Sequence, residues 1–550
     1  MWRTLFLFIL TVSLAPCAQG EAGCGFPCFP WMQRRYQAPR TWVESQEPAR
    51  IADYVVGGHI ELSLRDYVEL VLHNNTDVAL TRLQIHLLEN GVQRSLGVFD
   101  PSFQASFSPS RSTEQTTTWL QGVPNLISLT VPFSLSYQQL LPSGVTMNVS
   151  AGGQRYSSND AYSTFDPALS SNLSVQFTEP LLRNRGGLST RLAILIARSN
   201  LRAGGWTFRD QVTNLLANAE SAYWDAVQAR ENLAIQKKFL ELRRAALDLA
   251  RKQVAAGALL PLEVYQPSAN YASAELAGIQ AKLALLKSEN LIRQQIGADL
   301  DPKFNSLPIV LTEPYADAAA ALPDRESAVR QALDARLDRA ALLEKLHADD
   351  LGITGAADAL RPSLSLTGSY TSQGLAGVFS QFGSPLASLP GGSAITQVQG
   401  GFGQALSQMF RFGFPVYSGG ITLSLPLGNR AAGADLSNAY LAKRQDALQL
   451  RKINQGIRLQ VLNAIDDLET VQAAVKEASA ARDFAGKRFA AEQKKYELGV
   501  TQLFFVLDAQ TQLNAAEGDL LSESIASRRS LMTLHLALGD LLDERGVVLE

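Results

Sequence analysis

The chain has 550 residues, of which 46% are hydrophobic and 18% charged, with a formal net charge of −3. This composition excludes bulk disorder, which needs few apolar residues and a high net charge. The near-neutral charge argues against a nucleic-acid-binding protein. All three cysteines lie within residues 17–28, so neither a disulfide scaffold nor a cysteine zinc site is expected in the body of the chain.

The first 20 residues have the three parts of a secretory signal peptide: a positive charge, a short apolar run, and small residues before a cut after Gly20. The run is too short to cross a bilayer as a helix, and no later run of about 18 uncharged apolar residues follows. We therefore predict an exported protein without a helical membrane anchor. Residues 14–17 resemble a bacterial lipobox, so Cys17 is a candidate lipidation site, although Pro16 stands where a small residue is usual.

One ordered set of landmarks occurs twice in the chain. A shift of 261 residues aligns the segment from 64 with the segment from 325, and a shift of 242 aligns later landmarks such as Gly257 with Gly499. Each copy is predicted to contain a helix, strands, and a long helical hairpin. The first helices are expected over 64–96 and 325–359, and the long ones over 188–255, 262–296, 432–497 and 502–538.

The repeat divides the chain into segments. We expect the signal peptide at 1–20, an N-terminal extension at 21–60, the first repeat at 61–310, a linker at 311–325, the second repeat at 326–540 and a short tail at 541–550. The strands are expected within about 98–180 and about 362–427.

The long helices carry a narrow seam of small residues. From Leu215, apolar or small residues recur in alternating steps of four and three, mostly as alanine, which is a heptad-like pattern. A second apolar face runs through Leu216, Tyr223 and Val227. A helix of about 65 residues is about 100 Å long, which suits a spacer or a tube. An ordinary two-stranded coiled coil is the alternative, but it leaves the second face unexplained.

Six segments alternate apolar residues with Ser, Thr, Asn or Gln. They are 103–107, 127–137, 145–151, 173–177, 364–370 and 421–425. This alternation is typical of transmembrane β-barrels, although a soluble sandwich would show it too. Residues 141–144 predict a tight turn, and 112–125, 156–169 and 371–418 predict long loops. Short turns at one end and long loops at the other are typical of outer-membrane barrels.

With these landmarks, residues 61–540 resemble the outer membrane efflux proteins of the TolC type. The resemblance rests on motifs in the same order in both copies. They are Leu62-Ser63-Leu64, Asn74-Asn75 with Asp77, Phe99-Asp100-Pro101, Pro180-Leu181-Leu182, Gly257 with Val264, Gly499 with Val506-Leu507-Asp508-Ala509, Gly297 and Gly539.

The resemblance implies an α+β membrane protein. Three copies would form one outer-membrane β-barrel, continuous with a long periplasmic α-helical barrel. The duct would carry small molecules or proteins outward, and it would work with a periplasmic adaptor and an inner-membrane pump.

The chain departs from the family pattern in two places. The family usually has two strands per copy, whereas the first copy here has four candidates. If all six strands of the chain span the membrane, a trimeric barrel has eighteen strands rather than twelve; otherwise the pair at 126–155 extends beyond the membrane. The chain also stops soon after Gly539, so the girdle around the helices is expected from 21–60 and 298–325.

The turns at the two glycines hold the candidate functional residues. In the family, acidic residues beyond these turns ring the periplasmic mouth and a tyrosine helps to hold it shut; Thr501 and Phe505 stand where the family has a basic and a second acidic residue. The gate candidates are Glu263, Tyr496, Thr501, Phe504, Phe505 and Asp508. The adaptor-docking candidates are Ala256, Gly257, Ala258, Leu498, Gly499 and Val500.

Two interpretations of the gate stay open. The paired phenylalanines favour closure by apolar packing, because a ring of like charges repels itself. The bland alternative is that the acidic residues are ordinary solvated side chains of a hairpin tip.

No chemistry-bearing pattern is found elsewhere. The five histidines are scattered without ligand spacing, and no nucleophile elbow occurs. We therefore predict a non-enzyme with no catalytic residue, metal or cofactor. Two rivals to the duct are a periplasmic helical spacer and a soluble secreted enzyme.

Overall fold

The computed structural model describes residues 51–116, 121–160, 163, 165–257, 260–315, 321–379 and 400–547. The predicted signal peptide, Cys17 and Ala258 lie outside these residues. All elements below belong to one compact unit, Arg50–Glu550.

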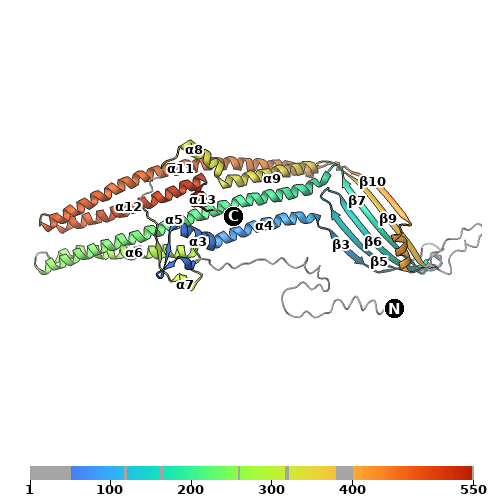
Figure 1. Ribbon diagram of the computed structural model, residues 1–550, viewed down its shortest axis with the longest axis horizontal. Coiled ribbons are helices and arrows are strands. Elements are labelled where there is room, and N and C mark those ends of the chain that lie inside the picture. Colours follow the sequence, from blue (N-terminus) through green and yellow to red (C-terminus); the bar gives the residue numbers. More distant parts are fainter. Residues whose placement is uncertain are drawn as a thin grey trace, which may run out of the picture. The chain divides into compact units, whose positions relative to one another are not determined.

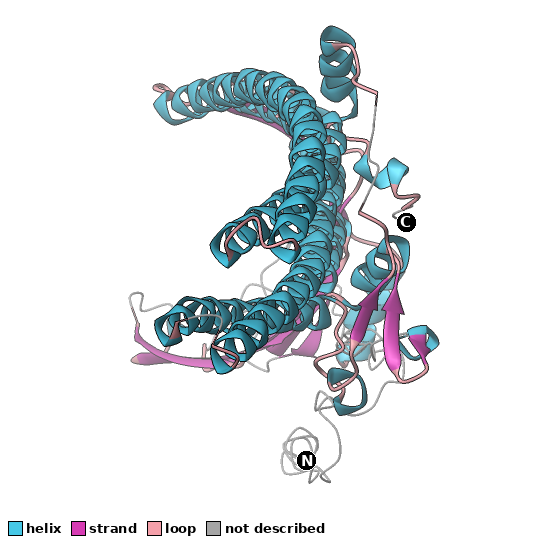
Figure 2. Ribbon diagram, turned by 90° about the vertical axis from the view of Figure 1, so that its left-hand side faces the viewer, coloured by secondary structure: helices cyan, strands magenta, loops and turns pink. Residues whose placement is uncertain are grey.

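Two long helical hairpins dominate this unit (Figure 1). The first joins α5 (Leu188–Ala255) to α6 (Tyr265–Gln295), and the second joins α11 (Arg430–Glu497) to α12 (Leu503–Leu538). These bounds lie close to the predicted ones. In α5, the seam residue Ala222 and the second-face residues Tyr223 and Val227 are all buried, so both predicted faces pack. Seen end-on, the long helices form a curved row (Figure 2). Among the described helices, none has the length and hydropathy required to cross a bilayer.

The first helix of each half is broken, so the prediction of one continuous helix is wrong in both places. The first half has α3 (Leu64–Asn74) and α4 (Thr76–Leu96), and the second has α8 (Arg325–Ala335) and α9 (Leu337–Ala359). The joints Asn75 and Arg336 are extended, with ψ of 126° in each. At the first joint, the Asn75 side chain accepts a hydrogen bond from the Asp77 N–H at 2.8 Å and thereby starts a new helix.

Within the described residues, a seven-stranded antiparallel sheet lies at the end of the long helices opposite their hairpin turns (Figure 1). Its strands are β3 (Ser102–Phe107), β4 (Ser110–Gln115), β5 (Asn125–Leu140), β6 (Thr146–Ser158), β7 (Phe165–Pro180), β9 (Ser363–Phe379) and β10 (Pro415–Ser424). The order is β10-β9-β7-β6-β5-β3, and β4 also pairs with β5.

The sheet has six strand positions, because β3 and β4 pair with successive parts of β5. The first half of the chain supplies four of them. The strands are longer than predicted and shorten the predicted loops. In particular, β9 runs to Phe379, and a helix, α10 (Phe402–Phe410), occupies part of the predicted loop 371–418.

The two faces of the sheet differ in polarity, as the alternation predicts. Residues paired across neighbouring strands share a face, and the chain Tyr137–Val149–Val175–Tyr370–Tyr417 runs across five strands on the apolar face. On the opposite face the corresponding chain is Ser136–Ser150–Ser174–Thr371. Large apolar side chains on the first face are exposed, among them Phe103, Leu135, Phe177 and Ile421.

The predicted tight turn packs against the start of α5. Gly144 has a φ of +87° and its N–H donates to the Leu141 carbonyl at 2.8 Å. A Cβ on Gly144 would lie 2.2 Å from the Gly187 nitrogen. No side chain fits between this end of the sheet and the first turn of α5.

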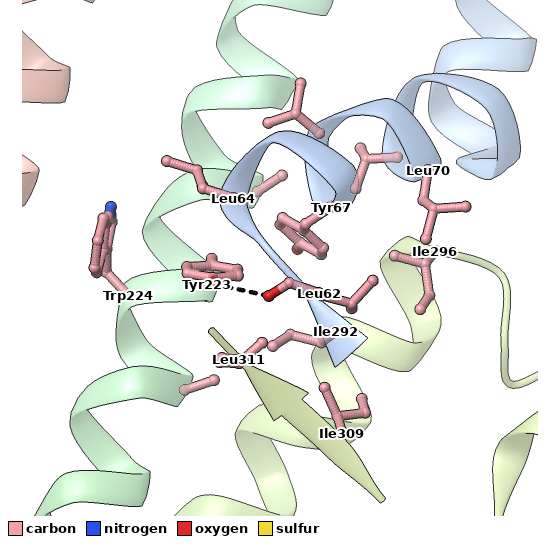
Figure 3. Packing of buried hydrophobic residues seen from close by; sticks show 14 of the residues in the cluster. Leu62, Leu64, Tyr67, Leu70, Tyr223, Trp224, Ile292, Ile296, Ile309 and Leu311 are labelled. Carbon is pink, nitrogen blue, oxygen red and sulfur yellow. Dashed lines mark hydrogen bonds between the residues drawn. The ribbon is translucent and has the colours of Figure 1, made fainter. Parts of the chain in front are cut away.

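A second, smaller sheet contains β1 (Val55–Val56), β2 (His59–Leu62) and β8 (Ile309–Leu311). It packs with α3 on α5 in the largest buried cluster (Figure 3). There, the Tyr223 hydroxyl donates to the Leu62 carbonyl at 3.1 Å and accepts from the Glu313 N–H at 3.2 Å. Burial raises the Tyr223 pKa to about 12. The girdle thus draws on both segments expected to form it, with the short helix α7 (Pro302–Asn305) nearby in sequence.

The last described residues also contact α5. The short helix α13 (Leu541–Glu544) is followed by Arg545, whose guanidinium donates to both oxygens of the buried Glu220 carboxylate, at 2.9 and 2.6 Å. This bidentate pair fastens the tail to α5, because neither charge is left unpaired on burial.

Candidate functional site

Each long hairpin turns on a glycine in the left-handed region. The φ angles are +75° at Gly257 and +74° at Gly499. The Gly257 N–H donates to the Val254 carbonyl at 3.0 Å, and the Gly499 N–H donates to the Tyr496 carbonyl at 2.9 Å. A residue with a Cβ is strained in this conformation. A Cβ at either position would meet nothing within 4 Å, so the space beside both turns is open.

The side chains around the turns are strongly exposed. Leu498 is 72% exposed and Val500 75%, and Ala256 is exposed as well. The apolar tips therefore have the accessibility that a docking surface needs; of the predicted docking residues, only Ala258 lies outside the described part of the chain.

A groove of ≈ 690 Å³ separates the two hairpins near their turns. Four of the six predicted gate residues line it: Glu263, Tyr496, Thr501 and Phe504. The Tyr496 hydroxyl donates to the Gln253 side-chain oxygen at 3.0 Å. This hydrogen bond links α11 to α5 across the groove.

The two phenylalanines contact each other at the start of α12. Their ring centroids lie 5.5 Å apart at 81°, a favourable edge-to-face geometry. Phe504 is 55% exposed and Phe505 46%, and Phe505 does not line the groove. In a single chain, therefore, both rings remain available for contact with another surface.

Asp508 also lies outside the groove, and it has a basic partner that sequence reasoning missed. Arg488 of α11 lies 3.0 Å from its carboxylate, and the Gln512 amide donates to the same oxygen at 3.0 Å. In the sequence, Arg488 and Asp508 lie about equally far before and after the Gly499 turn. Pairing residues across the hairpin in this way could have identified Arg488 as the partner. Glu263 has no ion pair within the described ranges.

A buried arginine forms a further link between the hairpins. Arg243 of α5 is 3% exposed, and its guanidinium donates to the Leu507 carbonyl at 3.1 Å and to the Thr511 hydroxyl at 2.5 Å. Burial lowers the Arg243 pKa. Continuing the steps of four and three from Leu215 leads to Arg243, so a cation within the alanine seam was the available signal.

The described residues of the tips form no metal site. Among the residues that the structure describes, no three histidine, cysteine or acidic side chains are grouped to hold a metal ion. The arrangement can form an opening between helices, a contact between copies, or a docking surface.

Comparisons with known proteins agree with this geometry. The family model described as outer membrane efflux protein matches residues 138–298. The pyoverdine export outer membrane protein OpmQ of Pseudomonas aeruginosa is 24% identical over 428 residues, covering 76% of this chain and 78% of OpmQ.

Solved channels share the fold. The outer-membrane channel OprN has a TM-score of 0.62 at 16% identity, over 86% of this chain and 89% of its own. The Neisseria gonorrhoeae channel MtrE has a TM-score of 0.59 at 18% identity, over 87% and 89%. The chain is therefore similar to the outer membrane efflux proteins, and this similarity supports a location in the outer membrane with an extension into the periplasm.

Proposed function

We propose that the chain forms the outer-membrane exit duct of a tripartite efflux or type I secretion system. It would pass small molecules or proteins from the periplasm or an inner-membrane pump to the exterior. One observation carries this proposal: helices of 68 residues each, α5 and α11, connect a sheet with one apolar and one polar face to accessible hairpin tips. Export of pyoverdine by the relative OpmQ is an instance of small-molecule cargo.

A periplasmic spacer without a duct is the second candidate. Both buried faces of α5 and the apolar face of the sheet count against it, because a spacer needs neither a wall of many helices nor a surface suited to lipid. The sheet's apolar side chains, such as Phe103 at 69% exposure, favour a membrane location instead.

The sheet also supports closure by copies of the same chain. Its two edges, β10 on one side and β3 with β4 on the other, are free of strand partners within the described residues. An exposed edge pairs readily with another strand. Three chains of six strand positions each give a barrel of eighteen strands. The same order of helix, strands and long hairpin in both halves supports an internal repeat, which suits a ring.

We place adaptor docking at the two glycine turns. The open space beside Gly257 and Gly499 lets a partner approach the backbone closely. Asparagine adopts the left-handed conformation more readily than other residues with a side chain, so Gly257→Asn and Gly499→Asn add a side chain with little backbone strain. Gly278→Asn, in α6 with open space around it, is the matched control.

Both tip variants are expected to lose export in cells while keeping stable trimers and a membrane location, and the control is expected to export normally. Full export by both tip variants would remove the docking assignment. If cell fractionation instead found the unmodified protein outside the outer membrane, the proposed duct itself would be wrong.

We further propose that packing closes the resting duct at the tips. Burying one aromatic ring contributes roughly 1.5–3 kcal/mol, and the exposed Phe504 and Phe505 would gain this in a ring of copies. Phe505→Ser should therefore raise single-channel conductance in planar bilayers. Asp508→Asn should chiefly change cation selectivity. An open channel from Asp508→Asn and an unchanged one from Phe505→Ser would show that charge, not packing, closes the duct.

A further inference from the structure

The helix α10 lies on the apolar face of the large sheet, as the short orange helix beside β9 in Figure 1. The Ser171 hydroxyl donates to the Ala405 carbonyl at 2.9 Å, and the Ser372 hydroxyl donates to the Met409 carbonyl at 2.6 Å. Ser171 is paired with Gly153, and Gly153 with Phe133, which places these contacts on the apolar face.

The helix runs across the strands rather than along them. Its first residue, Phe402, packs edge-on against Phe133 of β5, with centroids 5.4 Å apart. The Ala405 carbonyl contacts Ser171 of β7, and the Met409 carbonyl contacts Ser372 of β9. The side chains of Ala405 and Met409 are both buried. Because strands of a barrel cross the bilayer at a tilt, an element that crosses them lies close to the membrane plane.

Two glycines of the sheet, Gly153 and Gly374, leave room for α10, and we call them the seat of this helix. A Cβ on Gly374 would lie 2.0 Å from the Ala405 carbonyl oxygen, and a Cβ on Gly153 would lie 2.7 Å from the Phe402 ring. Gln408 also accepts a hydrogen bond from the Leu375 N–H at 3.0 Å, where β9 extends beyond the end of β10. The helix is thus fitted to this position on the sheet.

The distance between α10 and the end of the sheet nearest the long helices, taken along the axis of the proposed barrel, matches the thickness of an apolar membrane band. Along β7 (Phe165–Pro180), Pro180 lies nearest the long helices, and Ser171 lies under α10, nine residues farther along the strand. Nine residues at about 3.3 Å each, tilted by about 40°, give a height of about 23 Å. The apolar band of outer-membrane barrels is about 25 Å tall, with aromatic girdles at its borders.

The outer side of α10 has the composition of such a border. Phe410 is 62% exposed, and Phe412 and Phe414, which follow the helix, are 51% and 61% exposed. Two arginines, Arg411 after the helix and Arg155 on the same face of the sheet, are exposed. Aromatic rings and arginines together favour the boundary between acyl chains and anionic headgroups.

We propose that α10 is an interfacial helix that binds the headgroup boundary of the outer leaflet, with Arg155 and Arg411 contacting lipid phosphates. This inference rests on the proposed function only in placing the sheet in a bilayer. The partner is a lipid surface, and the helix sets the depth at which the sheet sits.

Spin-label depth measurements test the proposal in the full chain, reconstituted in vesicles of phosphatidylethanolamine and phosphatidylglycerol. Native cysteines are replaced by alanine, and single cysteines are introduced at Ser407 on the exposed side of α10, at Leu135 on the apolar face, and at Ser418 on the polar face. We expect the Leu135 label to report the acyl chains, the Ser407 label the headgroup depth, and the Ser418 label water.

The outcomes separate this inference from the proposed function. A Leu135 label in water would overturn the membrane location of the sheet. With Leu135 in the acyl chains, a Ser407 label in bulk water or deep in the acyl chains would overturn the interfacial helix. Strong spin–spin broadening at Ser407 would show that another copy of the chain, not lipid, covers α10.

A matched pair of glycine variants completes the test. Gly374→Ala places a methyl group against the Ala405 carbonyl and should displace α10, shifting the Ser407 label toward water. Gly368→Ala, on the same strand and face with open space around it, should leave the label depth unchanged. Equal depths in both variants would show that α10 is not held by its seat.

Discussion

Single side chains join the two hairpins close to their turns. The Tyr496 hydroxyl reaches Gln253 of the other hairpin, and farther from the turns Lys238 of α5 lies 3.0 Å from Glu517 of α12. An ion pair whose lysine is 60% exposed to water contributes little, whereas the half-buried tyrosine hydrogen bond is worth roughly 0.5–1.5 kcal/mol in each chain. The tyrosine is therefore the contact whose loss should be measurable.

Tyr496→Phe should raise the fraction of time that the channel is open in planar bilayers, because the ring keeps its packing while the bond to Gln253 is lost. Tyr265→Phe is the control, since this tip tyrosine is 70% exposed and makes no hydrogen bond to another described residue. Equal effects from the two substitutions would show that the Gln253 bond does not hold the tips together.

A histidine at the end of α12 should make stability depend on pH. The hydrogen bond from His535 to Asp540, 3.0 Å long, raises the His535 pKa above 6.5, against the opposing effect of burial. A raised pKa in the folded state stabilises the protein fully below pH 6.5, and this contribution is lost as the pH rises through the folded-state pKa.

The difference in urea midpoint between the unmodified protein and His535→Gln should therefore be larger near about pH 5.5 than near about pH 8.5, with a free-energy change of roughly 1 kcal/mol or less. A difference that grows toward alkaline pH would contradict the assignment.

At the scale of elements, sequence periodicity predicts the long helices well and the joints poorly. The seam from Leu215 locates α5 because a buried helix face repeats over many turns. The break at Asn75 has no proline or glycine to announce it, and a single capping side chain creates it. The same limit applies to α10, whose seat on Gly153 and Gly374 comes from distant strands and cannot be read from its own residues.

The two faces of β7 lead to a prediction at this scale. Val175→Arg places a charge on the apolar face, midway between Ser171 and Pro180, and should destabilise the inserted protein by roughly 2–4 kcal/mol. Gln176→Arg, one residue later and on the polar face, should change stability little. Heat-induced dissociation of the assembly in lipid measures both. A larger cost at Gln176 would mean that the polar face, not the apolar face, contacts lipid.

At the scale of the whole molecule, the strand count would decide the width of the proposed barrel. The hairpin of β5 and β6 lies between β3 and β7 in the sheet, so in the proposed trimer it would be part of the barrel wall. Barrel diameter grows roughly linearly with strand number, which makes an eighteen-stranded barrel about half as wide again as one of twelve. Sequence alternation identified the extra hairpin, but only the pairing registers place it inside the sheet.

Deleting residues 121–160 removes β5 and β6 and leaves β4 antiparallel to β7. Electron cryo-microscopy of the trimer should show eighteen strands for the unmodified chain and twelve for the deletion, with a diameter smaller by about one third. A twelve-stranded barrel in the unmodified protein, with the hairpin outside the wall, would disprove the wider barrel.

The contact between Gly144 and Gly187 also has a mechanical consequence. Because a Cβ on Gly144 would lie only 2.2 Å from the Gly187 nitrogen, the turn and the first residues of α5 are in close backbone contact and form a stiff joint. The 68-residue helix that starts there acts as a lever of about 100 Å. A rotation of one degree at the joint would move its far end by about 1.8 Å at that length, more than half of the Tyr496–Gln253 distance of 3.0 Å. The precision with which the hairpin tips are positioned is therefore determined at the opposite end of α5, where the helix packs against the sheet.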